Sequence, residues 1–293
     1  MIERKGEFKE YPKGHWKNFT VSVMSASSNL NEPAKQNAYQ VGKMLPELGM
    51  DGINGGYSVG GMGSFAEGYK EGSRAMGLSD DEIATHLKGV IYSEKVIGKT
   101  LAKERGVNSP ATITPTDSLP ERAGGIIGGS DVVIAVEGGV GTNIEALLAA
   151  QDQWFKERNT ENPKPIRPLI LIESTNMIED TIALNESRSP GTINTLTPYI
   201  YVLSGHSNPN IQKQDGEISV ATLQNDPAMH EKLQFLLEYF YLKREKDLKN
   251  PCDESRLQFL ETDSFSKDAP HKVFTIKEKL EAKQTLHGEG EGI

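Results

Sequence analysis

Short apolar runs alternate with longer amphipathic segments over the first two thirds of the chain. The clearest runs are Val132–Val136 and Pro168–Glu173, which have the continuous apolar character of central strands in a parallel sheet. Runs at residues 19–27, Met50–Ile53 and Leu87–Tyr92 predict three further strands. The run at 19–27 ends in a turn that is rich in serine and asparagine.

Helical periodicity follows most of these strands. Apolar residues at steps of three and four after Glu32 predict a helix that ends at Gly49. Further helices are predicted near Ser64–Met76, from Pro120, and from Thr142 to about residue 157. Because strands and helices alternate, we expect an α/β fold of the Rossmann-like type, with a doubly wound parallel sheet and helices on both faces.

The pattern changes towards both ends of the chain. Residues 1–17 are polar and are interpreted as an N-terminal arm, residues 18–204 as the Rossmann-like domain, and residues 205–293 as a helical extension with a polar tail. In this extension, Asp226 and Pro227 predict the N-cap and first turn of an apolar helix. The stretch from residue 249 onward is polar and predicts a loosely held tail.

The composition excludes several classes of protein. Among 293 residues, 32 Lys and Arg against 41 Asp and Glu give a formal net charge of −9, which repels polyanions, so we expect no binding to nucleic acid. No apolar run approaches the roughly 18 residues that span a bilayer, and no secretory signal is expected at the N-terminus. The single cysteine, Cys252, excludes an intrachain disulfide. These features predict a cytoplasmic protein without membrane attachment.

Three loops that follow predicted strands carry unusual residues. The most distinctive is Glu137–Glu145, where glycines allow a sharp turn and the close approach of an anion. The helix start in this loop supplies unpaired N–H groups, so a phosphate is the expected ligand. The loop Gly55–Gly63 has the same character, and the loop Ser25–Asn29 offers hydroxyl groups. Since ligands of open parallel sheets bind beyond the carboxyl ends of the strands, the three loops are candidates for one site.

Several common motifs are missing from the sequence. No Gly-Lys-Ser/Thr follows the glycines, which excludes a P-loop, and no strict G-x-G-x-x-G follows the first strand, which argues against an NAD dehydrogenase. The six histidines share no zinc-binding spacing, so neither a metal nor another cofactor is implied. Each loop taken alone also fits a tight strand–helix turn without a ligand.

Taken together, the motifs resemble the Lonely Guy (LOG) family of nucleoside 5′-monophosphate phosphoribohydrolases. The hallmark of that family is P-G-G-x-G-T-x-x-E, preceded by an E-R pair and by a G-G-x-x-x-G-x-M-G loop. The resemblance covers residues 18–204. The matching positions are Gly138, Gly139, Gly141, Thr142 and Glu145, then Glu121 and Arg122, then Gly55, Gly56, Gly60, Met62 and Gly63.

The resemblance implies a hydrolase that cleaves a purine or cytokinin-type nucleoside 5′-monophosphate to free base and ribose 5-phosphate. Cleavage builds positive charge on the ribose, which a carboxylate can stabilise. Glu145 and Arg122 are the expected catalytic residues, and a homodimer with sites near its interface is expected. The residues expected to bind the phosphate and the rest of the nucleotide are Gly138, Gly139, Val140, Gly141, Thr142, Gly55, Gly56, Gly60, Met62, Gly63, Ser27 and Glu121.

Other readings of the same residues stay open. Glu145 also fits a first-turn acid that interacts with the helix dipole, and Arg122 fits a surface salt bridge with Glu121 or Asp131. Two departures from the family pattern, Glu137 in place of proline and Ala123 in place of lysine, reduce the positive potential of the site.

A second hypothesis is therefore a non-catalytic binding or carrier protein for a nucleotide or a molybdenum-cofactor-like ligand. Related Rossmann-like proteins, such as molybdenum cofactor carriers, share the glycine loops without being hydrolases. A third hypothesis is a scaffold whose C-terminal helix recruits a partner, which is suggested by the apolar stripe Met229–Leu242.

Overall fold

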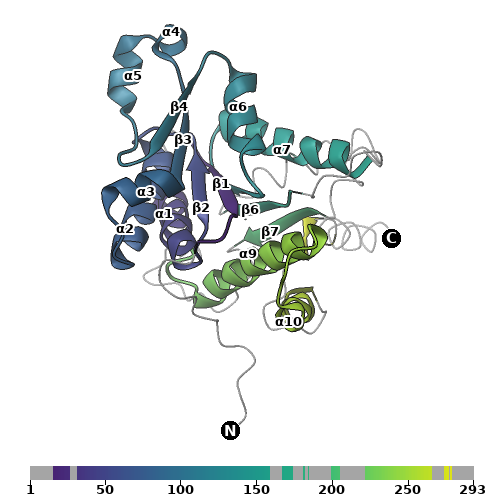
Figure 1. The fold of residues 1–293 in the computed structure, drawn as a ribbon. Coiled ribbons are helices and arrows are strands. Elements are labelled where there is room, and N and C mark those ends of the chain that lie inside the picture. The colour runs from purple at the N-terminus through teal and green to yellow at the C-terminus, as the bar shows by residue number, and fades with distance from the viewer. Residues whose placement is uncertain are drawn as a thin grey trace, which may run out of the picture.

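One β-sheet organises the part of the chain that the computed structural model describes, namely residues 16–26, 32–158, 167–173, 181, 184, 199–204, 222–265, 274–276 and 278. The sheet has eight strands there, in the order β4-β3-β2-β1-β5-β6-β7-β8 (Figure 1). Strands β1 to β7 pair in parallel, and β8 pairs antiparallel with β7. The strands are β1 (Thr20–Met24), β2 (Asp51–Asn54), β3 (Leu87–Tyr92), β4 (Thr112–Thr116), β5 (Val132–Val136), β6 (Leu169–Glu173), β7 (Ile200–Ser204) and β8 (Phe274–Thr275).

Helices cover both faces of the sheet, so the predicted Rossmann-like fold is confirmed (Figure 1). The run Val132–Val136 explains how one strand serves two cores. Val132, Ile134 and Val136 belong to the core that includes residues of α1, α2 and α9, while Val133 and Ala135 belong to the core with α6 and α7. The helices are α1 (Glu32–Glu47), α2 (Gly60–Ala75), α3 (Asp80–His86), α4 (Glu94–Ile97), α5 (Lys99–Arg105), α6 (Leu119–Gly128), α7 (Val140–Arg158), α9 (Pro227–Asp247) and α10 (Glu254–Phe265).

The direction in which the chain winds reverses between β1 and β5. From β1 the chain proceeds outward to β2, β3 and β4, then returns to the other side of β1 as β5 and continues to β6 and β7. The loops after β1 and β5 therefore diverge at the carboxyl edge of the sheet. In open α/β sheets this divergence creates the crevice in which ligands bind.

The C-terminal region differs from the sequence prediction. Asp226 caps α9 as predicted, because its Oδ1 accepts hydrogen bonds from the backbone N–H groups of Ala228 (3.0 Å) and Met229 (3.2 Å). The prediction of a loosely held tail from residue 249 is wrong for α10 and β8. Leu257 and Leu260 of α10 are buried in the core shared with α9, an amphipathic contact that the polar composition of this stretch concealed.

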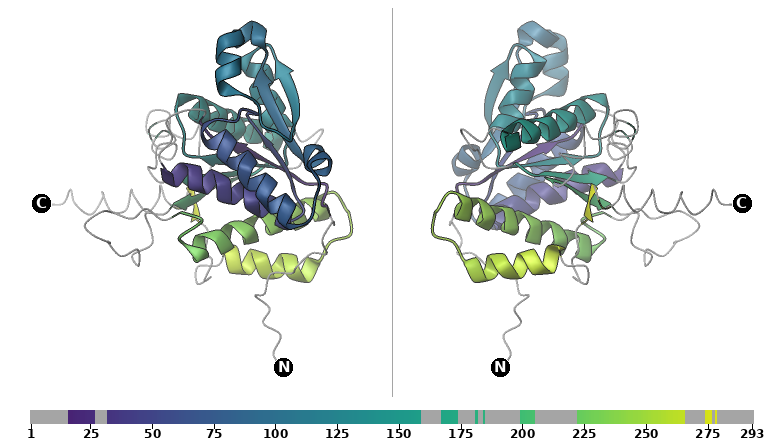
Figure 2. Two further views of the ribbon diagram at one scale, coloured as in Figure 1. Left: turned by 90° about the vertical axis from the view of Figure 1, so that its left-hand side faces the viewer. Right: turned by 90° about the vertical axis from the view of Figure 1, so that its right-hand side faces the viewer.

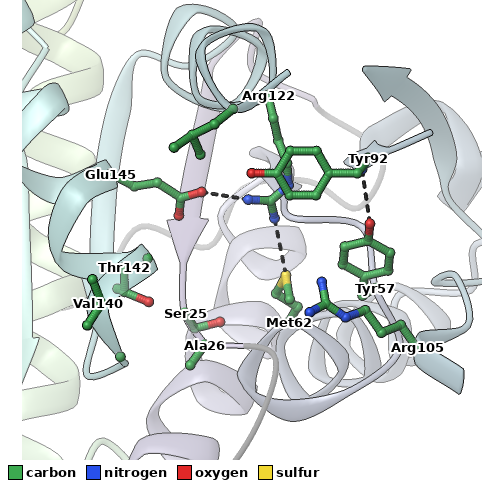
Figure 3. Close-up of a pocket in the computed structure, with 13 residues that line it drawn as sticks. Ser25, Ala26, Tyr57, Met62, Tyr92, Arg105, Arg122, Val140, Thr142 and Glu145 are labelled. Atoms are coloured by element: carbon green, nitrogen blue, oxygen red, sulfur yellow. Dashed lines mark hydrogen bonds and ion pairs between the residues drawn. The ribbon is translucent and has the colours of Figure 1, made fainter. Parts of the chain in front are cut away.

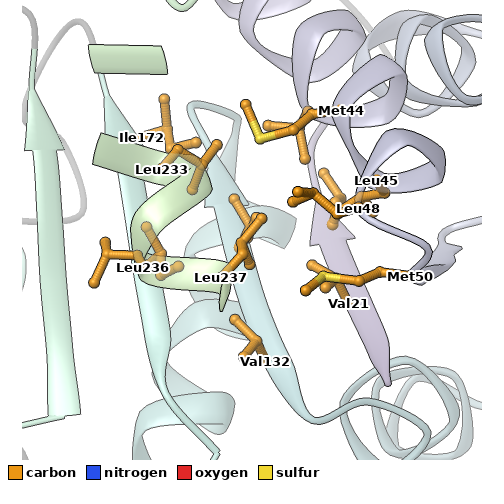
Figure 4. Packing of buried hydrophobic residues seen from close by; sticks show 14 of the residues in the cluster. Val21, Met44, Leu45, Leu48, Met50, Val132, Ile172, Leu233, Leu236 and Leu237 are labelled. Carbon is orange, nitrogen blue, oxygen red and sulfur yellow. The ribbon is translucent and has the colours of Figure 1, made fainter. Parts of the chain in front are cut away.

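The apolar stripe of α9 is buried within the chain itself. Leu233, Leu236 and Leu237 belong to the same buried core as Val132 of the sheet and Met44 of α1 (Figure 4). Figure 2 shows α10 as an outer layer against the far side of α9. The stripe that suggested a scaffold therefore covers the sheet and α10. Among the described helices, none combines the length and the apolar character that crossing a membrane requires.

Candidate functional site

A pocket of about 310 Å³ opens at the carboxyl ends of β1, β2, β3 and β5, beside the point where the strand order reverses (Figure 3). Its walls come from the loops after β1, β2 and β5, from the end of β3 and from α2, α5, α6 and α7. The lining residues are Ser25, Ala26, Tyr57, Met62, Tyr92, Arg105, Leu119, Arg122, Gly139, Val140, Gly141, Thr142 and Glu145.

The β5–α7 loop presents bare backbone to this pocket. A Cβ added at Gly139 or Gly141 would meet no atom within 4 Å, so both glycines face open space that a ligand can enter. A Cβ at Gly138 would overlap Thr142 and would lie 3.1 Å from the Ala26 backbone nitrogen. Position 138 therefore requires glycine because neighbouring atoms of the protein leave no room for a side chain. Because α7 begins at Val140, the N–H groups of its first turn have no partner within the helix and favour an anion.

Arg122 and Glu145 form a buried ion pair at the pocket. The Nη1 group of Arg122 donates to Oε1 of Glu145 at 2.6 Å, and the two residues are 8% and 6% exposed. Arg122 comes from α6 and Glu145 from the second turn of α7, so the pair joins two helices across the wall. The alternative interpretation of Arg122 as a partner of Glu121 or Asp131 in a surface salt bridge does not hold, since Arg122 is buried and pairs with Glu145.

Backbone and aromatic groups hold Arg122 in place. Its Nε donates to the Val90 carbonyl at 3.0 Å, and its guanidinium lies 5.2 Å from the centre of the Tyr92 ring. Nη2 makes longer contacts with the Gly55 carbonyl (3.4 Å) and the sulfur of Met62 (3.6 Å). A Cβ at Gly55 would overlap Arg122 and Met62. The glycine loop therefore provides the space in which Arg122 reaches Glu145.

The surroundings of Glu145 disfavour its charge. Burial raises the pKa of the Glu145 carboxyl above its ordinary value, and the charge and hydrogen bond of Arg122 act in the opposite, lowering direction. Among the described residues, Oε2 of Glu145 has no hydrogen-bond partner. One carboxylate oxygen is thus held by Arg122 while the other is available to a ligand.

The wall made by Tyr57, Tyr92 and Arg105 was not predicted as part of the site. The backbone N–H of Tyr92 donates to the Tyr57 hydroxyl at 3.0 Å, and the Arg105 guanidinium lies 5.1 Å from the centre of the Tyr57 ring. Tyr57 lies within a predicted loop, and Tyr92 ends a predicted strand, so position relative to strand ends could have indicated both. Arg105 lies in a stretch whose sequence pattern predicted no element.

The structure brings together part of the predicted set. Arg122 and Glu145 line the pocket, as do Met62, Gly139, Val140, Gly141 and Thr142. Gly55, Gly56, Gly60, Gly63, Gly138 and Glu121 do not line it. Gly55 and Gly138 shape the loops behind it, and Glu121 accepts a hydrogen bond from the Asp117 backbone at 2.9 Å. Ser27 lies outside the described residues, whereas its neighbours Ser25 and Ala26 do line the pocket.

The two departures from the family pattern lie off the pocket wall. Ala123 is buried in the core formed by α6, α7 and the sheet. Glu137 is buried at the end of β5 and is not a lining residue. Within the described residues, no group of three or more His, Cys, Asp and Glu side chains could hold a metal ion.

The sheet topology and the position of this pocket define a Rossmann-like α/β protein with a pocket at the switch point. Residues 18–154, slightly less than half of the chain, match the model of the SLOG cluster4 family, and the chain therefore contains a LOG-like domain. This match confirms the predicted resemblance at the level of a LOG-like family. No curated protein matches the sequence.

Several solved structures are similar to this chain at low sequence identity. A molybdenum cofactor binding protein from Rippkaea orientalis is 21% identical with a TM-score of 0.45, over 64% of this chain and 89% of that chain. The molybdenum cofactor carrier protein of Chlamydomonas reinhardtii is 18% identical with a TM-score of 0.43 over the same shares. DNA processing protein A from Helicobacter pylori is 14% identical with a TM-score of 0.36, over 62% and 78%.

Proposed function

We propose that this protein hydrolyses the N-glycosidic bond of a purine or cytokinin-type nucleoside 5′-monophosphate. The observation that supports this proposal is the buried Arg122–Glu145 pair in a pocket bounded by the N-terminus of α7. A phosphate bound to the first turn of α7 would place the ribose towards Glu145, one helical turn further on.

The proposed reaction uses the free oxygen of Glu145. As the C1′–N bond breaks, its electron pair leaves with the base and positive charge develops on the ribose. An ionised Glu145 stabilises that charge and orients a water whose oxygen bonds to C1′, and the proton released passes to the base. Arg122 fixes the carboxylate by its 2.6 Å contact.

The direct test is incubation of the full chain with AMP, GMP, CMP and an isopentenyl-adenosine monophosphate, followed by chromatography. We expect free base and ribose 5-phosphate in equal amounts from at least one of them. Release of no base from any of these nucleotides would refute the hydrolase.

A binding or carrier protein without turnover is the second candidate. It is supported by the burial of the Glu145 carboxyl, which raises its pKa and disfavours the charged form that hydrolysis needs. A nucleotide or phosphorylated pterin at about 100 times its dissociation constant would then stabilise the fold by about 2.7 kcal/mol. In this case no product would form, and a panel of ligands without any thermal shift would exclude the candidate.

The pH dependence of the reaction should follow Glu145. Because burial raises its pKa and only the ionised form stabilises the ribose cation, kcat/KM should fall with decreasing pH earlier than for an ordinary glutamate. Arg122→Gln removes the lowering effect of Arg122 and should move this acid limb to higher pH. Glu121→Gln, at an exposed neighbour, should leave it in place. Superimposable profiles for Arg122→Gln and the parent would contradict the role of Glu145.

We also propose that a second copy of the chain covers the start of α7. Val140, Ile144 and Leu148 recur at steps of four, are 75%, 40% and 40% exposed, and form an apolar stripe beside the pocket. Light scattering should give the mass of a dimer, and Ile144→Asp should give a monomer. Leu248→Asp, at a similarly exposed leucine just after α9, should stay dimeric. A monomeric parent chain would exclude this interface. The cytoplasmic location stays a prediction.

A further inference from the structure

We infer that Arg105 binds a second phosphoryl group, so that the pocket prefers a nucleotide with two phosphoryl groups to a monophosphate. This inference rests on the proposed nucleotide ligand and specifies its class. It also assigns a role to a residue that no sequence motif contains.

The charges that line the pocket support this role. Arg122 and Glu145 neutralise each other through their 2.6 Å contact. Arg105 forms no salt bridge within the described residues, and it lines the same pocket. Its guanidinium therefore gives the pocket a net positive charge, in a chain whose formal net charge is −9. A local charge of this sign favours an anionic group on the ligand.

Hydrogen bonds join the backbone around Arg105 to the glycine-rich loop that follows β2. The Ser58 hydroxyl donates to the Arg105 carbonyl at 2.9 Å. Two residues further on, the Asn108 backbone N–H donates to the Gly56 carbonyl at 2.9 Å. Gly106 has a φ of +58°, and a Cβ there would lie 2.5 Å from Oγ of Ser58. The end of α5 is thus fixed against the loop that also shapes the Arg122 site.

The side chain of Arg105 is also oriented. Its guanidinium lies over the ring of Tyr57, 5.1 Å from the ring centre (Figure 3). A guanidinium stacked in this way keeps its N–H edge available for bidentate contact with phosphate oxygens.

The first anion site lies on a different wall. It consists of the first turn of α7 together with the hydroxyl of Ser25, which is 6% exposed, lines the pocket and has no hydrogen-bond partner among the residues that the structure describes. In Figure 3, Val140 and Thr142 lie on one side of Ser25 and Met62, and Arg105 lies on the other. Two separate positive features therefore face one cavity, which matches a ligand with phosphoryl groups at two places.

Isothermal titration of the full chain with adenosine, AMP, ADP and adenosine 3′,5′-bisphosphate tests the inference. We expect at least one doubly phosphorylated nucleotide to bind about tenfold more tightly than AMP, which corresponds to one additional charge-assisted contact. ADP carries its second phosphoryl group on the 5′ phosphate, whereas the bisphosphate carries it on the 3′ oxygen of the ribose. Comparing the two ligands shows which of these positions Arg105 contacts.

The variant Arg105→Gln should remove this preference and leave AMP affinity within about twofold, since the first phosphate binds at α7. Lys103→Gln, an equal change of charge at an exposed position of the same helix, should keep the preference. Equal affinities of AMP and both doubly phosphorylated ligands, or a preference that survives Arg105→Gln, would overturn the inference while leaving the proposed function intact. Absence of binding by every phosphorylated nucleotide would overturn both.

Discussion

Replacing Glu145 by glutamine should reduce hydrolysis of the nucleotide by about a thousandfold, which corresponds to roughly 4 kcal/mol of transition-state stabilisation. The amide keeps the size of the side chain, and its oxygen can still accept the hydrogen bond from Nη1 of Arg122. What it loses is the negative charge that opposes the cation developing on the ribose. Single-turnover kinetics with the preferred monophosphate would measure the effect on kcat separately from binding.

The affinity for the nucleotide should change little in Glu145→Gln, because the phosphate contacts come from the first turn of α7. The matched control is Glu121→Gln, which alters an exposed acid whose side chain accepts a hydrogen bond from the Asp117 backbone N–H and does not line the pocket, so turnover should be unchanged. Turnover of Glu145→Gln within threefold of the parent would refute the catalytic role. If the parent protein itself binds the nucleotide and forms no product, the result would favour the carrier function instead.

The central part of the fold could be predicted because its signals are local. The residues of β5 are those that the apolar run indicated, since a strand buried on both faces must be apolar at every position. The glycine loops were visible for a similar reason. A backbone that contacts a ligand or a neighbouring chain segment excludes side chains, and this exclusion shows in the sequence as glycine.

The rest of the site depends on contacts between segments far apart in the sequence. Nothing near Arg105 indicates that Ser58 and Gly56 hold its backbone, because both bonds cross about 50 positions of the chain. The helix α10 was missed because few of its residues are apolar. Those apolar residues are buried by α9, a contact between helices that the local sequence does not show. Glycines also had two roles that composition does not separate. Gly139 opens the pocket, whereas Gly55 makes room for Arg122.

A third role of glycine, close helix packing, leads to the largest expected effect on stability. A Cβ at Gly68 in α2 would overlap the carbonyl oxygen of Tyr39 in α1, and one at Gly42 would overlap the Phe65 carbonyl in the opposite direction. These atoms belong to the backbones of two helices, so Gly68→Ala forces α1 and α2 apart and disturbs the core beneath them. We expect the free energy of unfolding to fall by about 3 kcal/mol.

The control is Gly124→Ala, at an exposed glycine of α6 with no atom within 4 Å of the added Cβ. This change should instead raise the free energy of unfolding by up to about 1 kcal/mol through helix propensity. Urea denaturation of both variants measures the difference, and a Gly68→Ala protein as stable as the parent would show that the two helices are not in the close contact described.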